Sequence, residues 1–580
     1  MIKRLTSSIR QYKKDTVLAP AFMVLEVAAE VLIPFLMADL MDKGVNDVNM
    51  DYIWKMGIVL VIVSFLSLAF GVFSGTYAAK ASAGFARNLR KDMYYNVQTF
   101  SFSNIDKFST ASIVTRLTTD VTNVQNAFQM IIRMAVRSPV MLILSLIMTF
   151  SINLELSLIF LAVIPFLGLG LYLIMSRVHP IFERVFRTYD RLNNVVQENL
   201  HGIRVVKSYV REDFEEEKFD AISENIYNDF TKAEKRLAFN MPLMQLCIYG
   251  CMLLIAWIGA RLIVGGTMTT GQLMSVITYT MQILMSLMML SMVFVMITIS
   301  RASAERIVEI LDEVPDLTNP DHPVYHVKDG SVSFKNVDFS YAKVKNKLCL
   351  SGVDISIASG ETVGILGGTG SSKTSLVQLI PRLYDVTGGE VLVGGMDVRQ
   401  YDIETLRNEV AVVLQKNVLF SGTIKENLRW GSEDATDEEM IRICKLAQAD
   451  EFIQSFPDGY DTHIEQGGTN VSGGQKQRLC IARALLKKPK VLILDDSTSA
   501  VDTRTDALIR KAFREEIPGT TKFIIAQRVS SVQDADKIIV MESGRVHGMG
   551  THEELLKSNQ IYKEVYYSQM KGGDFDEPKT

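Results

Sequence analysis

The feature that most constrains this chain is a series of six long apolar segments in its first half. Each is long enough to cross a hydrocarbon layer about 30 Å thick, which takes about 20 residues of α-helix. In lipid the backbone must satisfy its own hydrogen bonds, and a helix does so within one segment. The sequence therefore predicts an α-helical domain that crosses the bilayer six times, at roughly residues 17–41, 54–79, 133–151, 154–175, 241–263 and 271–299.

The connections between the segments predict the orientation of this domain. Two of them, 80–132 and 176–240, are long and rich in basic residues such as Arg87 and Arg184, whereas the others are short and carry few. Because basic loops stay on the cytoplasmic side, both long loops and both termini are expected in the cytoplasm. The long loops have a helical pattern, so spans two to five are expected to continue as helices beyond the bilayer.

The N-terminal stretch MIKRLTSSIRQYKK is basic, carries no acidic residue and leads directly into the first span. Ile2, Leu5, Ile9 and Tyr12 recur at helical spacing, which predicts an amphipathic helix lying on the inner membrane face. A mitochondrial presequence is the alternative, but almost nothing would be left to cleave before the first span. A secretory signal would have a shorter apolar core and a cleavage site with small residues.

Composition separates the chain into two domains. Hydrophobic residues make up 48% and charged residues 22%, and the two kinds are segregated on either side of about Arg301. We expect a transmembrane domain over 1–310, a proline-containing linker over 311–329, an α/β domain over 330–567 and a polar, disordered tail over 568–580. The net charge of −4 gives no reason to expect a nucleic-acid partner, and five scattered cysteines without a CxxC pair predict neither disulfides nor a zinc site.

A glycine-rich loop in ETVGILGGTGSSKTS predicts a phosphate site. An apolar strand breaks into glycines and then a lysine, so loop and helix N–H groups converge on phosphate oxygens. Lys373 is expected to neutralise the β- and γ-phosphates of ATP, and the Thr374 hydroxyl to coordinate Mg²⁺. The pattern has glycine where this chain has Ser372, so a crowded loop or a changed backbone angle is expected there. The predicted nucleotide-binding residues of the loop are Gly367, Gly370, Ser371, Ser372, Lys373, Thr374 and Ser375.

A second motif shows to which class of nucleotide-binding domain the phosphate loop belongs. The run VSGGQKQRLCIARALLKKPKVLILDD resembles, without a gap, the signature and the second acidic strand of ABC ATPases. In that family the signature opens a helix whose N-terminus contacts the γ-phosphate of ATP bound to the opposite subunit. The resemblance therefore implies that this chain contributes four signature residues to a composite site, namely Ser472, Gly473, Gly474 and Gln475.

The resemblance extends over about residues 1–567 and is closest to bacterial half-transporters of multidrug type. The fold class it implies is a six-span transmembrane domain of ABC exporter type, followed by an α/β P-loop ABC ATPase domain. Segments near 103–119 and 198–212 would be the coupling helices. It further implies that Tyr341 stacks on adenine, Gln415 senses metal and attacking water, Asp495 holds Mg²⁺, and Asp502 reaches across the dimer.

Three positions depart from the family pattern in one composite site. The acidic strand usually ends Asp-Glu, with the Glu polarising the attacking water, but here Asp496 follows Asp495. One methylene fewer draws the carboxylate back by about 1.5 Å, and misplacements of about 1 Å can cost roughly 10²-fold in rate. Gln527 replaces the family's histidine and cannot carry a proton or a charge. With Ser372 as the third departure, this site is predicted to bind ATP and hydrolyse it slowly.

An intact signature beside a weakened phosphate site is explained if the two belong to different composite sites. We therefore expect a heterodimer whose other half carries the competent Glu and His, with this chain's signature completing the partner's site. Three alternatives remain: a slow homodimer that uses aspartate as base, an uptake system on the exporter scaffold, and an ATP-gated regulatory membrane protein without cargo. A bacterial plasma membrane and outward transport are expected from the resemblance.

Two features inside the spans are candidates for contact with a small-molecule substrate. Glu26 and Glu30 lie four residues apart in the first span, and Arg133 and Arg137 show the same spacing in the third. Three interpretations are open: interhelix ion pairs, arginines that extend to the membrane interface, or an acidic cavity wall for cationic cargo. A methionine stripe in the last span predicts either helix packing or a surface for varied apolar ligands, and its members are Met281, Met285, Met288, Met289, Met292 and Met296.

Overall fold

The computed structural model of this chain describes residues 1–342, 344, 347–496 and 500–573. The chain forms two compact units, which we describe separately. The helical unit comprises Met1–Gln98 and Thr110–Glu313, and the α/β unit comprises Thr99–Ser109 and Val314–Thr580. The boundary falls three residues after the expected end of the transmembrane domain at residue 310.

The helical unit is built on six helices that are long and apolar enough to cross a membrane. This confirms the predicted six-span, multi-pass architecture. Their extent beyond the apolar segments confirms that the helices continue past the expected bilayer. The helices that contain the spans are α2 (Lys13–Leu40), α3 (Met50–Gln98), α6 (Val121–Ile152), α7 (Leu154–His201), α10 (Asn240–Val264) and α11 (Thr270–Asp312).

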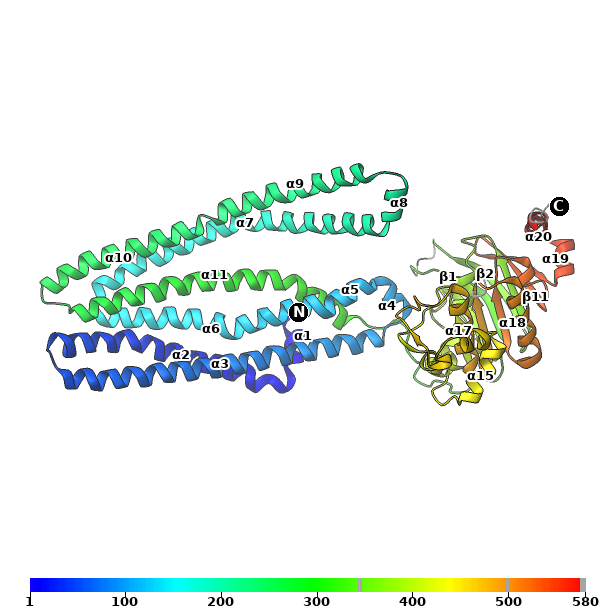
Figure 1. The fold of residues 1–580 in the computed structure, drawn as a ribbon, viewed down its shortest axis with the longest axis horizontal. Helices are drawn as coiled ribbons and strands as arrows, with labels where there is room; N and C mark the ends of the chain where they lie inside the picture. The colour runs from blue at the N-terminus through cyan, green and yellow to red at the C-terminus, as the bar shows by residue number, and fades with distance from the viewer. Residues whose placement is uncertain (343, 345–346, 497–499, 574–580) are drawn as a thin grey trace. The chain divides into compact units, whose positions relative to one another are not determined.

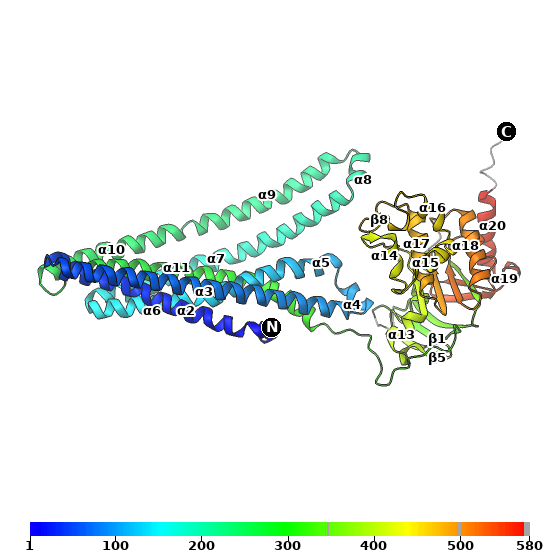
Figure 2. The same ribbon diagram turned by 60° about the horizontal axis from the view of Figure 1, so that its bottom comes forward.

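Packing inside the helical unit divides its helices into two groups (Figures 1 and 2). Helix α2 packs along α3, and α6 packs on α2 and α11, around a buried cluster that includes Met23, Val27 and Tyr279. The Tyr279 hydroxyl donates to the carbonyl of Val31 at 2.7 Å, so this cluster satisfies its polar atom internally. The second group is an arm in which α7 pairs with α9 (Glu212–Leu237) and α10, with α8 (Ile203–Ser208) joining α7 and α9.

The N-terminal segment differs from the single amphipathic helix that the sequence predicted. It forms α1 (Ile2–Thr6) and the 3₁₀ helix η1 (Ser7–Tyr12), interrupted at Arg10, whose φ of 42° and ψ of −112° are not helical. Contacts to α3 explain the interruption, because Arg10 pairs with Asp92 at 2.8 Å and Asn88 donates to the carbonyl of Ser8 at 2.8 Å. The segment is therefore packed on the bundle through its polar backbone as well as its apolar side chains.

The α/β unit contains a six-stranded sheet in the order β12-β11-β3-β10-β9-β6. All neighbours in it are parallel except β11 and β12. Its strands carry continuous apolar runs because helices and a second sheet cover the faces. The strand bounds are β3 (Thr362–Gly367), β6 (Val410–Val413), β9 (Val491–Asp495), β10 (Thr521–Ile525), β11 (Lys537–Glu542) and β12 (Arg545–Gly550).

A four-stranded antiparallel sheet in the order β2-β1-β4-β5 shares a core with this parallel sheet. Its strands are β1 (Val332–Phe339), β2 (Leu350–Ile357), β4 (Gly388–Val393) and β5 (Met396–Asp397), and a small pair is formed by β7 (Gly422–Thr423) and β8 (His463–Ile464). The helices of the unit are α12 (Lys373–Gln378), α13 (Ile403–Glu409), α14 (Ile424–Arg429), α15 (Asp437–Leu446), α16 (Asp450–Gln454), α17 (Gly473–Leu486), α18 (Thr503–Glu516), α19 (His552–Ser558) and α20 (Gln560–Gly573).

Two segments at the edges of the α/β unit bear on the sequence predictions. Helix α4 (Phe102–Lys107) comes from the first long loop but belongs to this unit by its contacts, and α5 (Thr110–Thr115) follows it. The expected coupling segments 103–119 and 198–212 thus contain the short helices α4 and α8. Helix α20 extends to Gly573, so the expected polar tail begins as helix, and residues 574–580 lie outside the described residues.

Candidate functional site

The phosphate loop joins β3 to α12, and three of its residues have a left-handed backbone conformation. Gly367 has a φ of 157°, and an added Cβ would lie 2.3 Å from the carbonyl oxygen of Met541, so no other residue fits there. Gly370 has a φ of 81°. Ser372 has a φ of 69° and a ψ of 26°, which is the left-handed helical region. Of the two outcomes expected at Ser372, the structure does not show the changed backbone angle: the loop keeps the left-handed conformation that glycine favours, with a serine in it.

Lys373 lies at the start of α12 and folds back over the loop. Its Nζ donates to the carbonyl oxygens of Gly367 and Gly368, both at 2.8 Å, and to Ser371 Oγ at 3.3 Å. Burial lowers the pKa of Lys373, while the carboxylates of Asp495 and Asp496 act in the opposite direction. The ammonium is thus held inside the ring of loop atoms that would surround a phosphate.

Thr374 and Asp495 form the pair that the sequence assigned to Mg²⁺. The Thr374 hydroxyl donates to Asp495 Oδ1 at 3.0 Å. Asp495 ends β9 and is buried, and burial raises its pKa, with Thr374 opposing this shift. Among the described residues no group of three or more His, Cys, Asp and Glu side chains could hold a metal. A hydroxyl and one carboxylate fit Mg²⁺ of the kind that keeps waters and takes its other ligands from substrate phosphates.

Asp496 is one of the three departures from the family pattern, and it contacts a second, Gln527. It has a φ of 47°, and its Oδ2 accepts a hydrogen bond from Gln527 Nε2 at 2.9 Å. Gln415 Nε2 lies at the limit of hydrogen-bond distance from the same oxygen, 3.5 Å. The structure therefore brings Gln415, Asp496 and Gln527 together. The glutamine side chain holds the shortened carboxylate at the end of β9.

Tyr341 lies beside the loop, on the side of α12. Its hydroxyl is 2.9 Å from Ser375 Oγ and donates to Gln378 at 3.3 Å. Burial raises the pKa of Tyr341. Sequence reasoning missed Tyr384, whose ring packs edge-on against Tyr341 at 5.0 Å and whose hydroxyl donates to Asp106 of α4 at 2.7 Å. The sequence gave one indication of this contact, since Asp106 falls in the predicted coupling segment.

The signature residues occupy the exposed start of α17. Ser472 is the N-cap: its Oγ accepts from the backbone N–H of Gln475 at 3.3 Å, and its own N–H donates to Gln475 Oε1 at 2.9 Å. Asp502 caps α18 by accepting a hydrogen bond from the backbone N–H of Thr505 at 2.9 Å, and the hydrogen bonds from Thr505 lower the pKa of Asp502. No described hydrogen bond or ion pair joins Ser472–Gln475 to the phosphate loop of the same chain.

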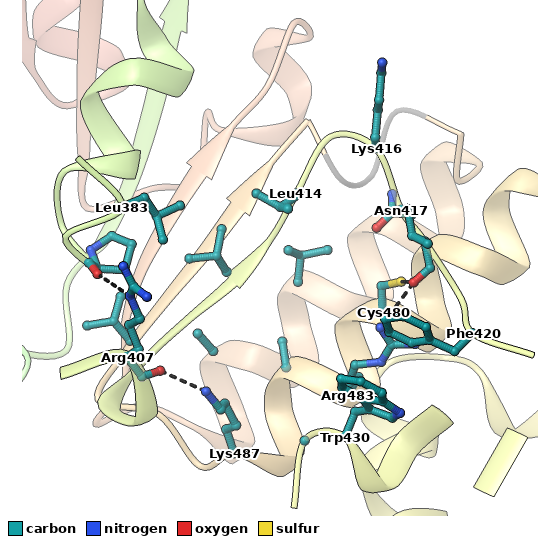
Figure 3. A pocket seen from close by; sticks show the side chains of 18 of the residues that line it. Leu383, Arg407, Leu414, Lys416, Asn417, Phe420, Trp430, Cys480, Arg483 and Lys487 are labelled. Carbon is teal, nitrogen blue, oxygen red and sulfur yellow. Dashed lines mark hydrogen bonds between the residues drawn. The ribbon is translucent and has the colours of Figure 1, made fainter. Parts of the chain in front are cut away.

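A groove of about 410 Å³ lies beside these elements (Figure 3). Apolar residues such as Leu383 and Leu414 share its wall with Arg483, whose guanidinium donates to the carbonyls of Asn427 and Val418. Phe420 stacks on Trp430 at 4.2 Å between ring centroids, and 63% of Trp430 is exposed. Phe102 of α4, which belongs to the α/β unit, also lines the groove.

Both units match families of known proteins. The model of the ABC transporter transmembrane region matches residues 16–287, and the ABC transporter model matches residues 350–499. The uncharacterized ABC transporter ATP-binding protein YfiB of Bacillus subtilis is 36% identical over 569 residues, which is 98% of this chain and 99% of that protein. The chain belongs to the ABC transporter family. It is a multi-pass membrane protein whose ATPase activity is coupled to transport.

Two further ABC transporters support the fold class. The solved structure of a bacterial Atm1-family ABC exporter with ATP bound has a TM-score of 0.80 and 25% sequence identity, covering 96% of this chain and 98% of that one. The ATP-dependent lipid A-core flippase of Desulfotalea psychrophila is 31% identical over 98% of this chain and 99% of its own length. The predicted fusion of a six-span exporter-type domain with an ABC ATPase domain is thereby confirmed.

The charged residues inside the spans of this ABC transporter form interhelix ion pairs. Arg137 of α6 contacts Glu26 and Glu30 of α2, each at 2.6 Å. Of the three interpretations left open by the sequence, this contact favours ion pairing over an acidic wall. For the methionine stripe, helix packing within this chain is not favoured. Four of its members are exposed on α11: Met281, Met285, Met288 and Met292.

We predict that Arg137→Gln destabilises the helical unit, because it leaves two carboxylates one turn apart without a counter-charge. The expected loss is about 3 kcal/mol, the lower end for a broken buried pair because the Arg137 side chain is partly exposed. The measurement is thermal unfolding of the purified chain in detergent. Arg133→Gln is the matched control, since Arg133 forms no ion pair with any described residue. An equal loss in both variants would show that the ion pairs are not responsible.

The left-handed Ser372 leads to a second prediction. An L-residue in this conformation costs about 1–2 kcal/mol, and glycine removes that cost but adds about 0.4–1 kcal/mol of unfolded-chain entropy. Ser372→Gly is therefore expected to stabilise the protein by a few tenths to about 1 kcal/mol, measured by thermal unfolding without nucleotide. Ser371→Gly, one residue earlier and outside the left-handed region, is expected to lower stability. Stabilisation by both variants, or by neither, would contradict this account.

Proposed function

We propose that this chain is one half of a heterodimeric ABC exporter in a bacterial plasma membrane, with both termini in the cytoplasm. Its own ATP site is of low activity, and its signature completes the active site of a second half-transporter. The observation that carries the proposal is the geometry around Asp496. This residue stands where the family has Glu, and Gln527, which stands where the family has His, donates to its carboxylate at 2.9 Å.

This geometry leaves Asp496 poorly suited to polarise an attacking water. Its reach is one methylene shorter than that of Glu, and its Oδ2 is already occupied by Gln527 and approached by Gln415. Gln527 donates through a neutral amide, so it stabilises developing negative charge less than a protonated histidine would. The site keeps the parts that bind nucleotide, which are the loop N–H groups, Lys373 and the Thr374–Asp495 pair.

The partner's site would contain the intact parts. In-line attack on the γ-phosphate needs positioning and charge stabilisation, which there come from the partner's lysine and from the N-terminus of α17 of this chain. When bound, Mg²⁺ neutralises charge on the β- and γ-phosphate oxygens. Ser472 and Gln475 hold each other in a capping box, so the exposed N–H groups at the start of α17 are already in place before the partner arrives.

The arm formed by α7, α8 and α9 supports assembly with a second chain. Large apolar side chains are exposed along it, and α8 contacts its own chain at the end of α7 and through the Lys207–Glu212 ion pair to α9. The exposed apolar residues of the arm include Leu200, Val205, Tyr209, Phe214 and Tyr227. Contiguous exposed apolar surface outside the lipid-facing region is typical of an interface.

The cargo we propose is small and apolar or amphipathic. Met281, Met285, Met288 and Met292 present flexible thioether side chains on an exposed face of α11, which suits ligands of varied shape. A relative of similar length, 31% identical, is named as a flippase for lipid A-core, an amphipathic molecule. Arg137 pairs with both Glu26 and Glu30, so this three-residue cluster would contribute one net negative charge to the cavity.

Purification of this chain from its native membrane tests the proposal. We expect a tagged chain to bring down an equal amount of a second ABC half-transporter with Glu and His in its ATP site. A slow homodimer is the second candidate, favoured by the carboxylate that the site retains at Asp496. Recovery of this chain alone as a dimer would support that candidate and exclude the heterodimer.

A further inference from the structure

A second charged pocket lies in the α/β unit at the edge of the parallel sheet opposite the phosphate loop. Its volume is about 130 Å³, enough for a small ion and a few waters, since one water occupies about 30 Å³ of liquid. Strands β3 and β10 enter the sheet here, at Thr362 and Lys522, which are paired neighbours. Because β3 runs from Thr362 to Gly367, this pocket is about 16 Å from the phosphate loop along the strand.

Lys522 is the unusual residue of the pocket. It is 3% exposed and lies on a central strand whose other residues are Thr521, Phe523, Ile524 and Ile525. Its side chain points to the face that also carries Ile524 and that α18 covers, where an apolar residue would be expected. Among the described residues its ammonium makes no hydrogen bond and no ion pair. Its nitrogen is not enclosed but opens onto the pocket, so the charge of this otherwise buried side chain is stabilised there by water or by an anion.

Arg514 of α18 adds a second cation to the same pocket. It is exposed at the mouth, and among the described residues it too has no ion pair or side-chain hydrogen bond. Burial lowers the pKa of Lys522, and the positive charge of Arg514 acts in the same direction. The two cations therefore repel each other across the pocket. Among the described residues, neither β10, which carries Lys522, nor α18, which carries Arg514, contributes a carboxylate to the pocket lining.

The acidic residues of the pocket are already engaged by other groups. Asp534 pairs with Arg510 at 3.0 Å, and Arg510 also contacts Asp506 at 3.3 Å. Asp536 accepts a hydrogen bond from the backbone N–H of Thr362 at 2.8 Å. Asp536 acts on Lys522 only through space, since no ion pair forms. The pocket lining thus has three cations, Arg510, Arg514 and Lys522, and two carboxylates, Asp534 and Asp536, which leaves one excess positive charge in the lining itself.

We propose that this pocket binds a small oxyanion, with phosphate as its chemical type, between Lys522 and Arg514. A compact group with several acceptor oxygens can accept hydrogen bonds from the Lys522 ammonium inside the pocket and from the Arg514 guanidinium at its mouth. Such charge-assisted hydrogen bonds are stronger than those between neutral groups. The bound species is either free phosphate or the phosphate group of a small phosphomonoester. The site is separate from the nucleotide site and does not depend on the proposed heterodimer.

The test is thermal unfolding of the full chain in detergent, with phosphate replacing chloride at constant ionic strength. Glycerol 3-phosphate serves as a second probe, so the two arms distinguish the free ion from a phosphomonoester. Lys373→Ala is the background, because it removes anion binding at the phosphate loop. We expect at least one probe to raise the unfolding temperature in this background.

The pocket variants decide whether that rise comes from this site. Lys522→Met and Arg514→Gln are each expected to abolish it or to weaken binding by about tenfold or more. Lys511→Met, the same charge change on α18 but outside the pocket, is expected to retain it. Arg514→Gln changes an exposed side chain, so the test stands even if Lys522→Met does not fold. The absence of any rise with either probe, or an undiminished rise in Arg514→Gln, would overturn the proposal.

Discussion

Ser472→Ala in this chain is expected to remove most of the ATPase activity of the assembled transporter, by about 10²-fold, whereas Asp496→Ala leaves most of it. Ser472 caps the start of α17, and in the proposed heterodimer its hydroxyl and the capped N–H groups would face the partner's nucleotide, which is why we expect this loss. Removing one positioned donor to developing negative charge typically costs about 10²–10³ in rate. Asp496 belongs to the site that we propose to be slow, so its loss is expected to subtract little from the total. The measurement is steady-state ATP hydrolysis by the co-expressed pair in lipid nanodiscs.

A matched control separates catalysis from helix capping. Thr551 caps α19 with the same capping box that Ser472 forms on α17, but away from any nucleotide. Loss of either cap costs about 1 kcal/mol of stability, so Thr551→Ala reports what the cap alone contributes. We expect Thr551→Ala to retain ATPase activity. If Asp496→Ala were the more damaging of the two site variants, the assignment of the sites would be reversed.

The second large effect is a gain of function. The double variant Asp496→Glu, Gln527→His is expected to raise hydrolysis at this chain's own site by about 10²-fold or more, because it restores the reach of the carboxylate. It also replaces a neutral amide by a residue that can carry charge toward the γ-phosphate. Asp496 and Gln527 are in direct contact at 2.9 Å, so the two changes are expected to be non-additive.

The gain is best measured where the partner-based site is silent. Ser472→Ala in the same chain provides that background, and the remaining hydrolysis then reports the site built on this chain's Lys373 and the partner's signature. Each single substitution is the control for the pair. An unchanged rate in the double variant would mean that Asp496 and Gln527 do not limit hydrolysis, and that the strained Ser372 or the partner's signature does.

The parts of the fold that the sequence could predict rest on regular patterns. Six apolar segments of membrane length and a phosphate loop that ends a strand both appear in the structure, because apolar length and local hydrogen bonding decide them. The break at Arg10 could not be read from the periodicity of Ile2, Leu5 and Ile9. It depends on tertiary contacts to Asp92 and Asn88 of α3.

Within the site, the sequence predicted residue types better than partners. It gave Gln415, Asp496 and Gln527 as separate departures or sensors, but only the structure shows one carboxylate oxygen serving both glutamines. It left Arg137 and Arg133 equivalent, although only Arg137 bridges Glu26 and Glu30. The sequence pattern of the strand could not predict the burial of Lys522, because that burial depends on α18 and on the neighbouring strands of the sheet.

The steady-state ATP turnover of this chain purified alone, in nanodiscs with Mg²⁺, tests the central claim most directly. The predicted result is turnover about 10²-fold below that of the co-expressed pair, with ATP still bound. Brisk hydrolysis by the unaccompanied chain, abolished by Asp496→Ala, would contradict it.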